Sequence, residues 1–112
     1  MAGVELEGVG AGSGGAAALS HVSSKKLQET FQAAARRVDV ALDTKQPGLH
    51  DATGLWEVPS ASVPSVVVSW AGSAATAHTP DDRPEAIDPD KLRQVGEMTA
   101  LTVMVIAGDP AY

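Results

Sequence analysis

The chain has 112 residues, of which 44% are hydrophobic and 20% charged, a composition typical of one globular domain and too short for two. It contains no cysteine, which excludes a disulfide scaffold and any thiolate-based metal or redox site. A net charge of −6 argues against nucleic acid or an anionic membrane as the main partner, and the sequence has no apolar run long enough to cross a membrane.

A short strand is the first expected element, over Val4–Leu6, where apolar and acidic residues alternate. It runs into a glycine-rich stretch in which Gly10, Gly12 and Gly15 have the G-x-G-x-x-G spacing of dinucleotide-binding sites. That fingerprint requires a helix directly after the last glycine, whereas Ala16–Val22 has the pattern of a second strand. We therefore expect a strand–turn–strand unit here, with dinucleotide binding as the weaker alternative.

An amphipathic helix is expected to follow, over residues 24–38, with a serine available to cap its first turn. Its apolar face is formed by residues at helical spacing, namely Leu27, Phe31, Ala34, Ala35 and Val38. Arg36 and Arg37 occupy the last turn, where cations complement the helix dipole. A solvated helix end is the expected role of this pair, and anion binding is the alternative. Residues 40–42 could add a short strand.

The second half begins with a stretch without clear periodicity, residues 44–62, which we expect to form a loop. Val63–Trp70 is then a continuous run rich in β-branched residues, as expected for a strand buried on both faces of a parallel sheet. Asp88 followed by Pro89 predicts a helix start, and Gly108 its end. The predicted apolar face of this helix consists of Leu92, Val95, Met98, Leu101, Val105 and Ile106. This order of strands and helices predicts an α/β fold.

The chain has three histidines, which are its first candidates for chemistry. His21 ends an apolar segment and fits a structural role, while His50 stands beside an aspartate in a loop and could orient a proton or be solvated. His78 lies in a proline-punctuated loop after the buried strand, a position where α/β proteins often place ligands. Asp81 and Asp82 follow, so a metal-bound imidazole with acidic neighbours is chemically reasonable. The alternative is an ordinary turn capped by aspartate side chains.

Four segments together carry a resemblance to a known family. Val63–Trp70 is similar to a buried G-I-P strand, His78–Asp82 to an H-T-x-x-D loop, Ile87–Leu92 to an I-D-P-x-x-L helix start, and Val4–Gly10 to an N-L-D-M-V-G strand end. Taken in chain order, the four motifs resemble the end of the two-zinc aminopeptidases, metallopeptidase family twenty-eight, over nearly the whole chain. The resemblance implies that the chain folds as the C-terminal portion of a three-layer α/β/α sandwich with a mixed, mostly parallel sheet.

The resemblance also implies a chemistry. In that family two zinc ions polarise the scissile carbonyl and supply a hydroxide nucleophile, with a glutamate as general base. By motif position, His78 matches the last histidine ligand. Glu7 matches the carboxylate ligand at the end of the L-D strand, with glutamate in place of the commoner aspartate. The implied cofactor is therefore zinc, the implied metal ligands are Glu7 and His78, and the implied substrate is a peptide cleaved at its N-terminus.

Several family motifs have no counterpart here. The H-x-D ligand pair, the bridging aspartate and the Glu-Glu pair lie upstream of the L-D strand, which here begins three residues after Met1. The S-D-H-x-x-F segment appears as Thr53–Val58 without its two polar residues, and Ala77 stands where many members carry an aromatic residue. We therefore expect residues 1–112 to be a single partial domain, inactive alone, with an exposed apolar sheet surface that favours self-association.

Two other hypotheses remain open at this stage. The chain could be a non-catalytic, degenerate homologue that acts as a structural or interaction module. It could also be an unrelated small acidic α/β domain whose loop only imitates the family.

Overall fold

The computed structural model describes residues 2–21, 25–44 and 63–112. These ranges contain, in chain order, β1 (Gly3–Leu6), β2 (Ala16–His21), α1 (Lys25–Arg37), β3 (Leu42–Asp43), β4 (Ser65–Trp70), the short 3-10 helices η1 (Ser73–Ala75) and η2 (Pro84–Ala86), and α2 (Pro89–Gly108). The α/β class predicted from the sequence is confirmed. The long loop expected over residues 44–62 lies almost wholly outside the described residues.

The four strands form one mixed sheet in the order β1-β4-β2-β3. β1 pairs with β4 in parallel, with Val4 opposite Val66, and β2 pairs in parallel with the two-residue strand β3. The longest pairing, β2 with β4, is antiparallel over all six residues of each strand. β4 therefore has a hydrogen-bonded neighbour on both of its edges.

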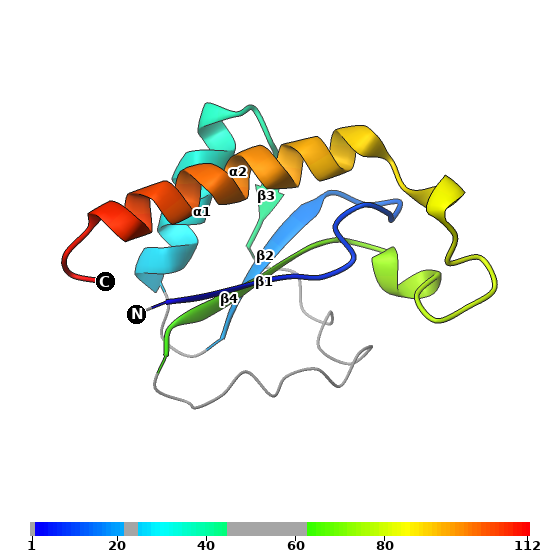
Figure 1. Ribbon diagram of the computed structural model, residues 1–112, viewed down its shortest axis with the longest axis horizontal. Helices are drawn as coiled ribbons and strands as arrows, with labels where there is room; N and C mark the ends of the chain where they lie inside the picture. Colours follow the sequence, from blue (N-terminus) through cyan, green and yellow to red (C-terminus); the bar gives the residue numbers. More distant parts are fainter. Residues whose placement is uncertain (1, 22–24, 45–62) are drawn as a thin grey trace.

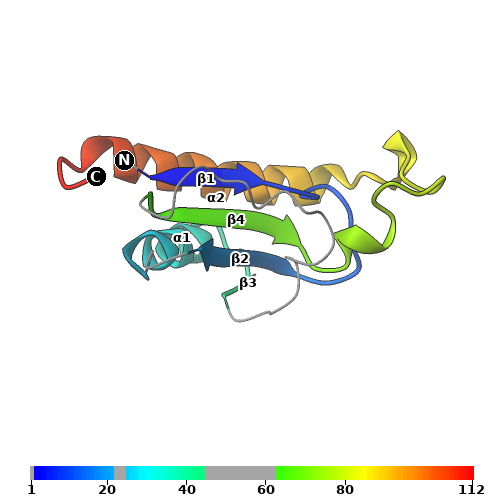
Figure 2. The same ribbon diagram turned by 90° about the horizontal axis from the view of Figure 1, so that it is seen from below.

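Both helices lie on the same face of this sheet (Figures 1 and 2). α1 contacts β2 and β4, and α2 packs alongside α1. In Figure 2 the sheet lies in front of the two helices. The described residues thus form two layers, with the hydrophobic core between the sheet and the helix pair.

β4 is the most completely buried element. Val66 and Val68 have no exposed surface and belong to the core cluster on the helix side. Ser65, Val67 and Ser69 alternate with them along the strand, and at most 5% of each residue is exposed. The prediction that this strand is buried on both faces is confirmed.

The apolar face predicted for α1 is also confirmed. Leu27 and Phe31 are fully buried, and Ala34 and Ala35 are nearly so. Small alanines late in the helix let it approach its neighbours closely, while the large side chains of its first half fill the space above the sheet.

α2 begins as predicted, and four of the six residues predicted for its apolar face pack in or against the core, namely Val95, Met98, Leu101 and Ile106. The Asp88 side chain accepts a hydrogen bond from the Asp90 backbone N–H at 2.9 Å, and Pro89 occupies the first helical position. The fully buried residues are Val95 and Met98, as predicted, and Thr102, which was not predicted. Thr102 reaches the core because its hydroxyl donates to the Met98 carbonyl at 2.9 Å, which satisfies the polar group.

Two residues predicted to face the core from α2 are largely exposed: Leu92 at 43% and Val105 at 53%. The prediction was wrong for them because the apolar residues of this helix extend around more than one face, so spacing alone did not select the buried stripe. No helix within the described ranges has both the length and the hydrophobicity to cross a membrane.

Two methionines of α2 give a matched test of this packing. Met98 is fully buried, whereas 71% of Met104 is exposed. We expect Met98→Ala to lower the free energy of unfolding by about 2–5 kcal/mol, because the substitution leaves a cavity in the core. Met104→Ala should change it by no more than about 0.5 kcal/mol. Urea denaturation followed by circular dichroism measures both, and equal losses would contradict the helix orientation described above.

Candidate functional site

The carboxyl ends of β1 and β4 lie side by side because the two strands are parallel neighbours. Open α/β sheets commonly bind ligands at such an edge. Two backbone hydrogen bonds hold the loop after β1 against the loop after β4. Gly14 N–H donates to the Ala71 carbonyl at 2.9 Å, and Ala71 N–H donates to the Gly15 carbonyl at 2.9 Å.

Close packing explains two of the glycines in the loop after β1. Gly8 has a φ of 57°, and a Cβ there would lie 2.5 Å from the Ser73 hydroxyl oxygen. Gly12 has a φ of 126°, and a Cβ there would lie 2.7 Å from the Ala71 carbonyl oxygen. Both positions therefore require glycine for conformation and for space.

The chain continues from this loop into β2, and the first helix begins only at Lys25. The predicted strand–turn–strand unit is confirmed. The dinucleotide alternative lacks the structural context that its fingerprint needs, which is a helix opening directly after the last glycine.

Lys91, in the first turn of α2, is a residue at this edge that the sequence analysis missed. Its ammonium group donates a hydrogen bond to the Gly12 carbonyl and lies 5.3 Å from the centroid of the Trp70 ring. A cation in the first turn of a helix opposes the helix dipole, which could have signalled a specific partner for this side chain. Through these contacts Lys91 joins the start of α2, the glycine loop and the end of β4.

A hollow of about 390 Å³ lies beside Lys91 at this edge. Apart from Lys91, its wall consists of small and hydroxyl-bearing residues, among them Gly12, Ser13, Gly72, Thr76 and Ala86. None of the described lining residues carries an imidazole or a carboxylate. Lys91 is therefore the only titratable side chain among the described lining residues.

Glu7, the predicted carboxylate ligand, is the first residue after β1 and is half-buried. Its backbone N–H donates to the Val68 carbonyl at 2.9 Å, which continues the β1–β4 ladder by one residue. The strand pairing thus fixes the Glu7 backbone at the carboxyl edge of the sheet.

His78, the predicted histidine ligand, is exposed in the loop after η1 and has a φ of 61°. Its backbone N–H lies 3.3 Å from a carboxylate oxygen of Asp82 and donates to it. Nearby, the Thr79 hydroxyl donates to the Thr76 carbonyl at 2.6 Å and accepts from the Asp81 N–H at 3.2 Å. Side-chain capping therefore shapes this turn, as the alternative interpretation of the loop expected.

A zinc site needs more ligands than the described residues bring together. The carboxylate of Glu7 and the imidazole of His78 are donors of the types that zinc binds, but zinc sites normally take at least three protein ligands. Within residues 2–21, 25–44 and 63–112, no three His, Cys, Asp or Glu side chains are grouped to hold a metal ion. The sharing of one ion by Glu7 and His78 stays a prediction.

The other two histidines fall wholly or partly outside the described residues. The backbone of His21 ends β2, but its side chain lies outside the described part of the chain. His50 and the segment Thr53–Val58 also lie outside it.

No family model, no curated protein and no solved structure matches the chain. The family resemblance therefore depends on its motifs alone.

Two glycines of the loop after β1 test the packing at this edge. Gly12→Ala should lower the free energy of unfolding by about 1–3 kcal/mol, because the residue has a positive φ and its new Cβ would meet the Ala71 carbonyl. At Gly15 a Cβ would meet no atom within 4 Å, so Gly15→Ala should be neutral or raise stability by less than about 1 kcal/mol. Thermal and urea unfolding compare the two, and a Gly12→Ala protein as stable as wild type would contradict the close approach.

Proposed function

We propose that the chain is the C-terminal part of a two-zinc aminopeptidase-like protein, and that it supplies Glu7 and His78 to a zinc site at which peptide N-termini are hydrolysed. The observation that carries the proposal is the arrangement of β1 and β4. They are parallel neighbours, Glu7 directly follows one of them, and the His78 loop follows the other. Residues from both motifs thus leave the same edge of the sheet.

The burial of β4 supports the finer architecture implied by the family. Its face opposite the helix pair, formed by Ser65, Val67 and Ser69, is nearly inaccessible to solvent. A strand covered on both faces is characteristic of an α/β/α sandwich, in which the sheet is the middle layer. We propose that the two layers described above are part of such a three-layer domain.

When bound, zinc would polarise the peptide carbonyl and lower the pKa of a bound water. The role of this chain would be to hold two ligand groups in place: the Glu7 carboxylate at a strand end and the His78 imidazole on a capped turn. Both groups must be deprotonated to bind the metal. The remaining ligands and the general base would come from parts of the protein outside this chain. The chain alone should therefore have no peptidase turnover.

The second candidate is a non-catalytic, degenerate homologue that acts as a structural or interaction module. The observation that favours it is the outer surface of the last half of α2. No charged residue occurs from Met98 to Gly108, and Val103, Met104 and Val105 are 47%, 71% and 53% exposed. An exposed apolar surface of this kind is typical of interaction sites. Self-association would then use this exposed helix surface.

A zinc titration of the purified chain tests the metal-ligand assignment. Two ligands alone bind zinc weakly, so we expect zinc to shift the imidazole resonances of His78 only at high concentration, and Glu7→Gln to weaken this binding by about tenfold or more, because one of two ligands is lost. Glu5→Gln is the matched control, since Glu5 lies two residues earlier on the same strand and the resemblance gives it no ligand role.

The outcomes separate the hypotheses. Equal effects of Glu7→Gln and Glu5→Gln, or no response of His78 to zinc, would contradict the assignment and favour the interaction module. Turnover of an aminoacyl p-nitroanilide by the chain alone, abolished by a chelator, would contradict its proposed inactivity.

A further inference from the structure

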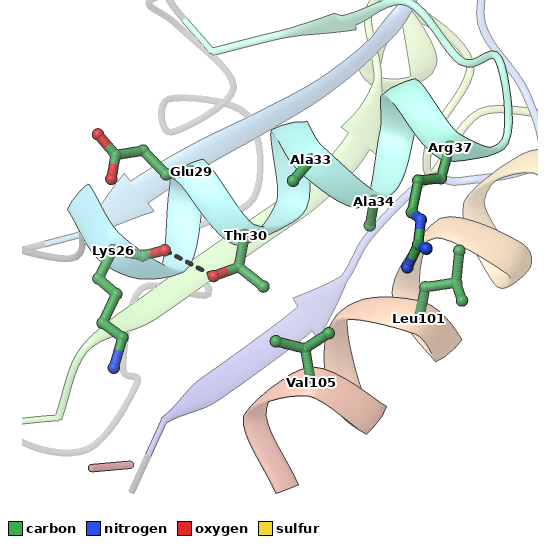
Figure 3. Close-up of a pocket in the computed structure, with 8 residues that line it drawn as sticks. All are labelled: Lys26, Glu29, Thr30, Ala33, Ala34, Arg37, Leu101 and Val105. Carbon is green, nitrogen blue, oxygen red and sulfur yellow. Dashed lines mark hydrogen bonds between the residues drawn. The ribbon is translucent and has the colours of Figure 1, made fainter. Parts of the chain in front are cut away.

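A second hollow, well away from the sheet edge, lies in the groove between α1 and α2 (Figure 3). Its volume is about 330 Å³. The floor is apolar and is formed by Ala33 and Ala34 of α1 and by Leu101 and Val105 of α2. The groove is open because α1 carries alanines where it faces α2, so no large side chain fills the space between the helices.

Charged groups stand at both ends of this α1–α2 groove, and within the described part of the chain the cation at one end has an acidic partner while the cation at the other has none. At one end Lys26 donates to an Asp109 carboxylate oxygen at 2.7 Å and lies 4.4 Å from the centroid of the Tyr112 ring. This hydrogen bond lowers the pKa of Asp109, so the carboxylate stays ionised and neutralises Lys26 at neutral pH. The Lys26 end of the groove therefore has little net charge.

Arg37 occupies the other end. Figure 3 shows its side chain extending from the last turn of α1 toward Leu101 of α2. Among the described residues it has no hydrogen-bonded or ion-paired carboxylate. Glu29 also lines the groove, but it pairs with Lys25 at 3.7 Å and points away from α2. The groove thus presents an apolar floor that ends at an unpaired guanidinium.

We propose that the α1–α2 groove binds a medium-chain fatty carboxylate, with its carboxylate on Arg37 and its hydrocarbon chain along Ala34, Leu101 and Val105. A guanidinium pairs with a carboxylate through two parallel hydrogen bonds, and the apolar floor removes methylene groups from water. The hollow has the size of a small-molecule site, whose volumes begin near about 300 Å³. This ligand site is independent of the proposed zinc site.

Titration with sodium decanoate, kept below its micelle-forming concentration, tests this site by two-dimensional NMR of the isotope-labelled chain. We expect saturable shifts of the backbone amides of Thr30, Ala34, Leu101 and Val105. Arg37→Gln should raise the dissociation constant about tenfold, because it removes the charge-assisted hydrogen bonds. Arg36→Gln is the matched control: Arg36 is the adjacent exposed arginine and lines a different hollow, so the dissociation constant should stay within about twofold of wild type.

Two further measurements separate the contribution of the ligand's carboxylate charge from that of its hydrocarbon chain. Decanol should bind the wild-type chain about as weakly as decanoate binds the Arg37→Gln variant. Ala33→Phe, a substitution at an exposed position of α1, should block the groove and abolish the shifts while the circular dichroism spectrum stays unchanged. Saturable binding that neither Arg37→Gln nor Ala33→Phe weakens would overturn the proposal. So would shifts confined to other elements, or no saturable binding at all.

Discussion

Strand β4 is paired along both edges and buried on both faces, and β1, β2 and α1 contact it directly. β1 and β2 bind its two edges, and the side chains of Val66 and Val68 meet those of α1 and α2 on one face. A strand in this situation has no exposed backbone to hydrate, so its N–H and C=O groups must all be satisfied by neighbouring strands. Its sequence accordingly consists of small and β-branched residues followed by one tryptophan.

The consequences of this central strand are clearest at its carboxyl end. The segment that follows β4 packs directly against the glycine-rich loop that follows β1. Gly8 and Gly12 allow the two segments to touch, and Lys91 joins both of them to the start of α2. The sheet edge that carries Glu7 and the His78 loop is therefore built by backbone and side-chain contacts within the chain. For this reason the loop geometry should be maintained whether or not a metal binds.

Much of this fold could be predicted from local patterns. The apolar stripe of α1, the Asp88–Pro89 helix start and the two-sided burial of β4 all follow from residue spacing and side-chain type. Those signals are local, and the structure reproduces them. The antiparallel pairing of β2 with β4 and the core position of Thr102 could not be predicted, because each depends on which segments meet after the chain has folded.

The same distinction applies to the two candidate sites. The motifs identified Glu7 and His78, since a motif is a pattern in sequence. Lys91 and the α1–α2 groove depend on contacts between residues far apart in the sequence: Lys91 and Gly12 are separated by 79 positions, and Lys26 and Asp109 by 83. No spacing rule within one helix predicts that Arg37 will end an apolar floor contributed partly by the other helix.

Hydrogen exchange under native conditions tests most directly whether β4 is the centre of the structure. Amides that open only on global unfolding exchange slowest, and the account assigns that behaviour to Val66, Val67 and Val68. They should exchange much more slowly than Val105 and Ile106 at the end of α2, where the helix is exposed on its outer side. If the β4 amides exchange as fast as those of the last turns of α2, the central position of β4 is contradicted.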